Sequence, residues 1–206
     1  MTLFLSRHPK TRANQQGLIL GGRDSPPTLD GLSVFRRVME RLGPEPVAGL
    51  VSSPLPRALA GARIGAAMFH CGLRIEPGLS ELSCGLWEGR PRAELGLADR
   101  PIRRHWDDRP PGGESCLDAE TRLAPLIGRL KAENHPAPLL IVGHAAVNRV
   151  FLKLWLGLDC MEALALEPGF DEVYVLTPGG GLEILSASEK ARTRSCPACS
   201  KTGTYC

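Results

Sequence analysis

The sequence predicts a three-layer α/β/α domain built on a mostly parallel, mixed β-sheet. Apolar runs typical of buried strands alternate along the chain with segments whose apolar residues recur at helical spacing. Such alternation is typical of a parallel sheet covered by helices. With 206 residues, 43% of them hydrophobic, the chain is long enough for one domain with a buried core, or for one domain and an appendage.

The predicted strands are short apolar runs without helical periodicity. The last two are separated by the turn Pro-Gly-Gly-Gly, which favours an antiparallel edge beside the parallel strands. The strands are predicted over residues 2–6, 47–53, 138–144, 171–177 and 182–187.

The predicted helices combine apolar spacing with recognisable ends. Gly43 and Gly157 are typical helix stops, and Ser115 with Asp118 three residues later resembles a capping box. Pro125 lies inside the helix predicted to start at Ser115, and it predicts either a kink in that helix or a later start. The helices are predicted over residues 28–43, 54–69, 115–134 and 145–157.

Residues 72–114 interrupt this alternation. They are rich in Gly, Pro and Arg, and only residues 73–77 look extended. Loops of this length are usually functional or disordered. Six arginines between residues 90 and 109 favour an anionic small molecule, or else simply a solvated charged loop. Trp87 and Trp106 are candidates for the substrate side of a site, with the core as the equal alternative for Trp87.

Composition excludes several classes of protein. A net charge of +3 without a dense basic stripe argues against nucleic acid as a partner. No apolar run approaches the roughly 20 residues of a membrane span, and no secretory signal begins the sequence, so we expect a cytoplasmic location without membrane association. The pattern of four scattered cysteines indicates reduced thiols: Cys71, Cys84, Cys116 and Cys160.

Polar side chains stand at the ends of three predicted strands. Arg7 and His8 follow the first, Ser53 ends the second just ahead of Arg57, and His144 ends the third. In open α/β sheets ligands bind beyond the carboxyl ends of the strands. Gathering these cations costs Coulomb energy unless an anion joins them, and a tetrahedral phosphate suits arginine and imidazole donors.

The same stretches resemble a known family. LFLSRHPKT at residues 3–11 is similar to the L-x-R-H-G-x-T opening of the histidine phosphatase superfamily, which includes the cofactor-dependent phosphoglycerate mutases. Matching stretches follow in the family's order up to residue 150: GLILGGRDSPPTLDG, SSPLPRALAGA, LSELSCGLWEG, PGGES and IVGHAAVNRV. The resemblance implies a phosphoglycerate mutase-like fold over residues 1–190 and leaves a Cys-rich tail, 191–206, uncovered.

The resemblance also implies roles for individual residues. His8 matches the nucleophile that becomes a phosphohistidine. Arg7, Arg57 and His144 match the phosphate pocket and stabilise the transferring group. Asn14 and Ala145 match further phosphate contacts. No metal or other cofactor is implied for catalysis.

Glu81 and Glu88 compete for the role of proton donor to the leaving oxygen. Glu81, in LSELSCG, matches the family's usual position and ranks first, and Glu88, in WEG, ranks second.

Two departures from the family pattern bear on activity. Pro9 stands where glycine is usual, but proline keeps the carbonyl that orients the nucleophilic ring in the family. Ala145 and Ala146 replace two glycines and add methyl groups near the phosphate. An active phosphomonoesterase acting on a small phosphorylated metabolite is the leading interpretation, and a catalytically silent phosphate-binding protein is the rival.

Chain length favours hydrolysis over mutase activity, because the mutases carry longer insertions after the region of Glu81. The PGGES segment and compact length resemble the α-ribazole phosphatase branch, which serves cobalamin synthesis.

The tail offers Cys196, Cys199 and Cys206, which is three of the four ligands that a closed zinc site needs. A second subunit of a homodimer, or another part of the chain, would have to supply the fourth ligand. Redox chemistry and a mobile terminus are the alternatives for this tail.

Overall fold

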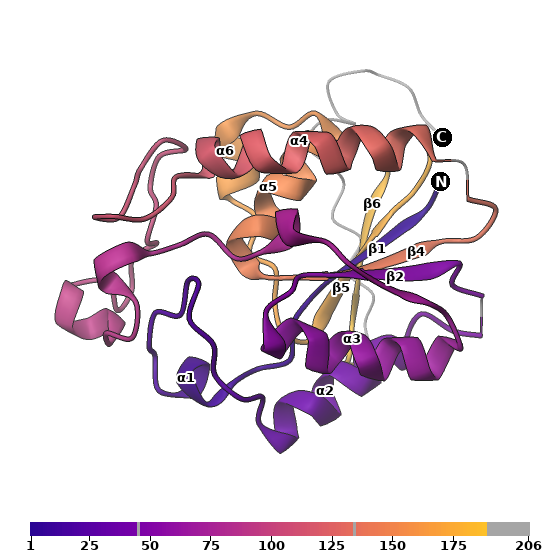
Figure 1. Cartoon of the computed structure of the whole chain (residues 1–206), viewed down its shortest axis with the longest axis horizontal. Coiled ribbons are helices and arrows are strands. Elements are labelled where there is room, and N and C mark those ends of the chain that lie inside the picture. Colours follow the sequence, from indigo (N-terminus) through magenta and orange to yellow (C-terminus); the bar gives the residue numbers. More distant parts are fainter. Residues whose placement is uncertain (45, 134, 189–206) are drawn as a thin grey trace.

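A computed structural model describes residues 1–44, 46–133 and 135–188 (Figure 1). Its centre is a six-stranded sheet of order β3-β2-β4-β1-β5-β6. The first four strands in that order run parallel, while β5 and β6 are antiparallel to their neighbours. The strands are β1 (Leu3–Arg7), β2 (Gly49–Ser52), β3 (Leu73–Ile75), β4 (Leu139–Gly143), β5 (Glu172–Leu176) and β6 (Leu182–Ser186). The predicted mixed sheet with an antiparallel edge is therefore confirmed.

Helices cover both faces of the sheet, as Figure 1 shows, with α2 and α3 below it and α4, α5 and α6 above it. The side chains of β1 pack into the core on both faces of the sheet, because successive side chains of a strand point to opposite faces. Leu3 and Leu5 pack into the core under α4 and α5, and Phe4 packs into the core against α2 and α3. The helices are α1 (Arg12–Gln15), α2 (Leu29–Glu40), α3 (Pro56–Phe69), α4 (Cys116–Ala132), α5 (Ala145–Leu156) and α6 (Cys160–Leu164).

The observed helices begin or end at capping residues that can be recognised in the sequence. Thr28 accepts a hydrogen bond from Gly31 N at the start of α2, and Ser115 and Asp118 form a reciprocal capping box at the start of α4. Gly157 ends α5 with a φ of 71°, a conformation that glycine adopts readily. The predicted start of α4 at Ser115 is confirmed. The alternative of a later start was wrong, because α4 runs from Cys116 through Pro125 as one element.

Two short helices, α1 and α6, were not predicted, since both are too short to show a periodic pattern. Within residues 72–114 the extended piece is confirmed as β3, and the rest contains three 3-10 turns: η1 (Pro77–Leu79), η2 (Gly85–Trp87) and η3 (Arg92–Leu95). In the parts of the chain that the structure describes, no helix is both long and apolar enough to cross a membrane.

The tail cysteines Cys196, Cys199 and Cys206 lie outside the described residues. Zinc binding by this tail stays a prediction. Within the described ranges no group of three or more His, Cys, Asp or Glu side chains is arranged to hold a metal ion.

Candidate active site

The parallel pairing of β1 with β4 and of β4 with β2 brings three strand ends together. Arg7 lies opposite Gly143, and His8 N donates to Gly143 O at 2.9 Å, so His8 and His144 leave adjacent strands side by side. Their ring centroids lie 5.0 Å apart. From the next strand, Ser53 N donates to Val142 O and its hydroxyl lies 2.7 Å from His144 Nε2. The predicted meeting of polar residues at one sheet edge is thus observed.

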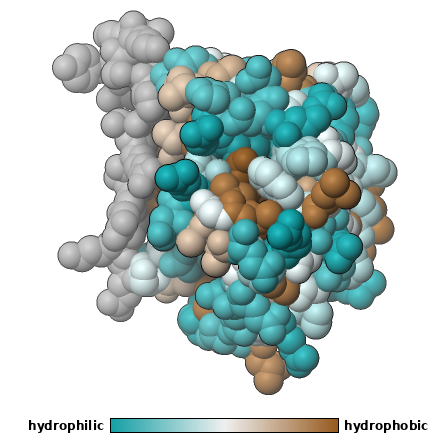
Figure 2. All heavy atoms as spheres, turned by 90° about the vertical axis from the view of Figure 1, so that its left-hand side faces the viewer, coloured by the Kyte–Doolittle hydropathy of each residue, from teal (hydrophilic) through white to brown (hydrophobic). Residues whose placement is uncertain are grey.

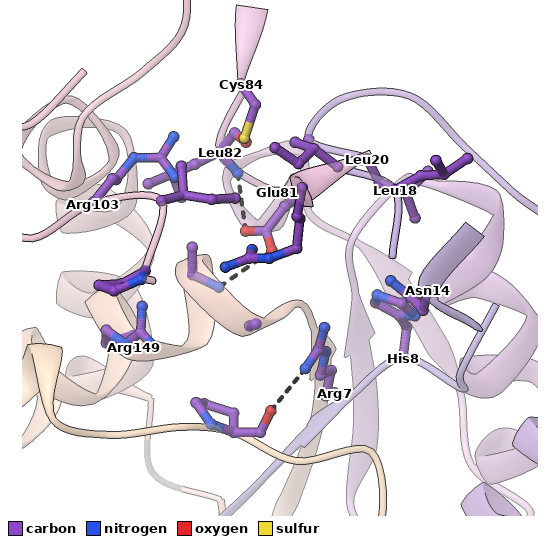
Figure 3. Close-up of a pocket in the computed structure, with 18 of the residues that line it drawn as sticks. Arg7, His8, Asn14, Leu18, Leu20, Glu81, Leu82, Cys84, Arg103 and Arg149 are labelled. Carbon is purple, nitrogen blue, oxygen red and sulfur yellow. Dashed lines mark hydrogen bonds between the residues drawn. The ribbon is translucent and has the colours of Figure 1, made fainter. Parts of the chain in front are cut away.

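A cavity of about 430 Å³ opens at this edge. Six of the residues predicted to catalyse or to bind substrate line it: Arg7, His8, Asn14, Arg57, Glu81 and Ala145. His144 is fully buried beside His8 and is not among the residues that line the cavity. Figure 2 shows this end of the molecule as mostly hydrophilic around a central group of apolar residues, and Figure 3 shows the side chains that converge on the cavity.

The His8 ring is oriented by its own neighbour. Nδ1 lies 2.7 Å from the carbonyl oxygen of Pro9, which can only accept a hydrogen bond, so the proton of the neutral ring resides on Nδ1. Burial first, and then the nearby His144, Arg7 and Arg57, keep the pKa of His8 well below its ordinary value. At neutral pH the ring is therefore uncharged and offers the lone pair of Nε2 as a nucleophile.

The site holds two buried arginine donors without acceptors. Arg7 Nε and Arg57 Nε are buried and have no hydrogen-bond partner within the described residues, and the buried His144 Nδ1, a donor or an acceptor according to the tautomer, also has none. An unpaired buried donor costs roughly 1–3 kcal/mol. Their clustering around His8, together with Ala145 at the N-terminal end of α5, indicates a receptor for an anion with several acceptor oxygens.

Both arginines are held in place by other contacts. Arg57 donates to Gly21 O and Arg23 O and pairs with Asp24 at 3.2 Å. Arg7 donates to Pro168 O at 3.1 Å, and its guanidinium carbon lies 3.7 Å from the centroid of the Phe170 ring. Burial, opposed in part by Glu81, lowers the pKa of Arg7 to about 10, so Arg7 remains charged at neutral pH.

The two candidate proton donors occupy different places. Glu81 lines the cavity and its carboxylate accepts from Ala146 N at 3.2 Å and Val147 N at 3.0 Å, at the start of α5. Figure 3 shows its carboxylate directed into the cavity.

Glu88 is absent from the residues that line this cavity, and it joins two loops instead. Its Oε1 accepts from Gly22 N, Cys84 N and Ser83 Oγ at 2.9–3.0 Å. Burial raises the pKa of Glu88, but these donors outweigh it and leave the pKa below its ordinary value. The geometry therefore favours Glu81 as the carboxyl that can reach a leaving group.

Other residues considered from the sequence divide between site and core. Asn14 accepts from Thr11 through its amide oxygen, which leaves its NH₂ group for a ligand. Trp106 is not on the substrate side, because it is buried and donates to Glu120 at 2.7 Å. Trp87 lines a different cavity from the one that contains His8. Of the six arginines in residues 90–109, Arg92 and Arg103 reach the main cavity.

Sequence reasoning missed Pro168 and Phe170, which hold Arg7. They lie in a loop ahead of β5 and carry no periodic or motif signal. Because β5 is antiparallel to β1, with Val173 opposite Ser6, this loop reaches the catalytic edge from the opposite direction.

Comparisons with known proteins agree with this arrangement. The profile of the histidine phosphatase superfamily (branch 1) matches residues 3–187. A probable phosphoglycerate mutase GpmB from Proteus mirabilis (strain HI4320) is 32% identical over 164 residues, 77% of this chain and 76% of that protein. The corresponding protein of Enterobacter sp. (strain 638) is 33% identical over 147 residues, 68% of each chain.

Solved structures share the fold. A mycobacterial glucosyl-3-phosphoglycerate phosphatase, Rv2419c, in complex with VO3 has a TM-score of 0.75 and 27% identity, covering 85% of this chain and 90% of that one. An alpha-ribazole phosphatase from Shigella flexneri has a TM-score of 0.77 and 24% identity, covering 95% and 96%.

The packing of Pro9 gives a first prediction. A Cβ added at Gly61 of α3 would lie 2.7 Å from Pro9 Cδ and 3.0 Å from the Phe35 ring. Gly61→Ala should lower the free energy of unfolding by about 1–3 kcal/mol through overpacking. Gly128→Ala is the matched control, because its Cβ meets nothing within 4 Å and should stabilise α4 by about 0.5–1 kcal/mol. Urea unfolding measures both variants, and equal stabilities would contradict the packing argument.

Proposed function

The chain belongs to the histidine phosphatase superfamily, and we propose that it hydrolyses phosphomonoesters of small metabolites through a phosphohistidine on His8. The observation that carries the proposal is the state of His8. Its ring is neutral, is oriented by the Pro9 carbonyl, and lies near the unpartnered Nε donors of Arg7 and Arg57. A nucleophile beside an anion receptor is the arrangement that two-step phosphoryl transfer needs.

The proposed reaction has two displacements. In the first, His8 Nε2 forms a bond to phosphorus, the ester P–O bond breaks, and protonated Glu81 gives its proton to the leaving oxygen. In the second, water attacks phosphorus, Glu81 takes a proton from that water, and the P–N bond breaks to restore His8 and release inorganic phosphate. Arg7 and Arg57, which line the cavity, stabilise the negative charge on the transferring group in both steps, and His144 supports them from its buried place beside His8.

Pro9 supports turnover rather than silent binding. The carbonyl that orients His8 is retained, and the chain accommodates the proline ring against Gly61. Ala145 and Ala146 also leave the cavity open, and Ala146 N donates to Glu81. These contacts favour an active enzyme over a catalytically silent phosphate-binding protein.

Mutase activity is the second candidate, because relatives at 31–33% identity are named probable phosphoglycerate mutases. A mutase returns the phosphoryl group to a substrate and needs a bisphosphate primer, whereas a phosphatase gives it to water. Phosphate release without a primer therefore supports hydrolysis. α-Ribazole 5′-phosphate belongs in the substrate panel because of the likeness to that branch.

The first test of the proposal is phosphate release from a panel of phosphomonoesters with chelator present. We expect release by the wild-type protein and by His105→Ala, whose exposed histidine lies outside the cavity, and at least a thousandfold loss in His8→Ala. Quenched wild-type reactions should contain alkali-stable, acid-labile phosphate on His8, and vanadate should inhibit. Equal release by wild type and His8→Ala would contradict the proposal.

The second test separates the two carboxylates. Glu81→Gln should reduce kcat for alkyl phosphates by about 10²–10⁴-fold, and much less for p-nitrophenyl phosphate, whose leaving group needs no proton. Glu88→Gln keeps an Oε1 acceptor for Gly22, Ser83 and Cys84 and should retain activity within a few fold. Loss of activity in Glu88→Gln with retention in Glu81→Gln would reverse the assignment.

A further inference from the structure

Glu81 lies outside any helix or strand, between η1 and η2. Its carboxylate nevertheless has a defined place, because its two oxygens accept hydrogen bonds from Ala146 N and Val147 N in the first turn of α5. A side chain on an irregular stretch of chain keeps one position only if the backbone that carries it is fixed by other contacts. Those contacts are found along residues 78–83, which we call the Glu81 segment.

Arg122 of α4 holds the first half of the Glu81 segment. Its Nη1 donates to Gly78 O and its Nη2 donates to Ser80 O at 2.8 Å, 44 and 42 residues away along the chain. Its third nitrogen, Nε, pairs with Glu114 Oε1 at 3.0 Å. All three nitrogens of the planar guanidinium are therefore engaged, a set of contacts that the single ammonium group of lysine cannot reproduce.

Glu114 and Arg103 hold the second half of the segment. Glu114 Oε2 accepts a hydrogen bond from Ser83 N at 2.8 Å. Arg103 donates through Nη2 to Ser83 O and through Nε to Glu114 O, both at 2.9 Å. The Glu114 carboxylate joins the two halves, because it also pairs with Arg122. Figure 3 shows Arg103 on the same side of the cavity as Glu81.

The apolar side of the segment is fixed in a different way. Leu79 and Leu82 are fully buried in the core that they share with α4 and α5. Hydrophobic burial is not directional, so these leucines keep the segment against the core without setting the direction of its backbone. Hydrogen bonds to the carbonyl groups are directional, and they set it.

We propose that Arg122 is a positioning residue for proton transfer: by binding Gly78 O and Ser80 O it fixes the backbone from which Glu81 reaches the leaving oxygen. The inference rests on the proposed hydrolysis and adds to it the residue that places the acid. Arg122 is not among the residues that line the cavity, so in the proposed reaction its effect on the rate passes through Glu81.

The test uses the leaving group to isolate proton transfer. kcat is measured for the best alkyl phosphate of the substrate panel, whose leaving oxygen needs a proton, and for p-nitrophenyl phosphate, whose leaving group needs none. The variants are Arg122→Gln and Arg122→Lys, with Arg74→Gln as the control. Arg74 lines a different cavity and pairs with Glu133 at 3.3 Å, so its variant removes the same charge and a comparable ion pair.

We expect Arg122→Gln to lower kcat for the alkyl phosphate about 10- to 100-fold and kcat for p-nitrophenyl phosphate less than about threefold, since a displacement of about 1 Å can cost this much in rate. Arg122→Lys keeps the charge beside Glu114 but cannot bind both carbonyls, so it should restore only part of kcat. Arg74→Gln should change neither rate. Equal losses on both substrates, or no loss on either, would overturn the inference.

Urea unfolding shows whether each variant is folded. If Arg122→Gln does not fold, Arg122→Lys carries the comparison between the two substrates, with the same expected order of losses.

A double variant shows whether the effect passes through Glu81. Residues that act as a unit are not additive, so Arg122→Gln should lower the alkyl phosphate rate less than about twofold further once Glu81→Gln has removed the acid. An additional loss as large as that in the single variant would show that Arg122 acts by another route and would contradict the inference.

A measurement without turnover separates this inference from the proposed hydrolysis. ¹³C NMR of protein labelled at glutamate Cδ reports the Glu81 carboxyl, assigned by its absence in Glu81→Gln. We expect its signal to shift or broaden in Arg122→Gln and to coincide with that of the wild type in Arg74→Gln. A changed signal supports the positioning role even if the wild type releases no phosphate, and an unchanged signal contradicts it even if phosphate is released.

Discussion

The hydrogen bond between His8 Nδ1 and the Pro9 carbonyl is the contact on which the proposed chemistry of this protein depends. It places the single proton of a neutral imidazole away from the cavity and leaves the lone pair of Nε2 facing a ligand. Burial between His144 and two arginines makes protonation of that ring unfavourable. The same burial leaves Arg7 Nε and Arg57 Nε without acceptors among the described residues, so in the proposed reaction one environment would both activate the nucleophile and bind the anion that it attacks.

The sheet supplies this environment through its strand order. Parallel pairing of β1, β4 and β2 brings His8, His144 and Ser53 to one edge, and the antiparallel β5 brings the loop with Phe170 to the same edge. The parallel strands supply the groups proposed to react, and the loop before β5 holds the Arg7 side chain through Pro168 O and the Phe170 ring. The ring of Pro9 packs against Gly61, where a Cβ would lie 2.7 Å from Pro9 Cδ.

Much of this could be predicted from the sequence, for a physical reason. Residues that follow parallel strands must share one edge, so the sequence alone is enough to expect Arg7, His8 and His144 together. The loop before β5 could not be placed, because nothing in the sequence states which strand β5 joins. The place of Glu88 also depends on a partner distant in sequence, since its Oε1 accepts a hydrogen bond from Gly22 N.

The most direct measurement is nitrogen NMR of ¹⁵N-histidine-labelled protein, with His8 assigned by its absence in His8→Gln. The account predicts that His8 carries its proton on Nδ1 at pH 7, with Nε2 bare, and stays uncharged as the pH falls below the ordinary histidine pKa of about 6.5. A ring protonated on Nε2 at pH 7, or one that becomes charged near pH 6.5, would contradict the claim that the fold prepares His8 as a nucleophile.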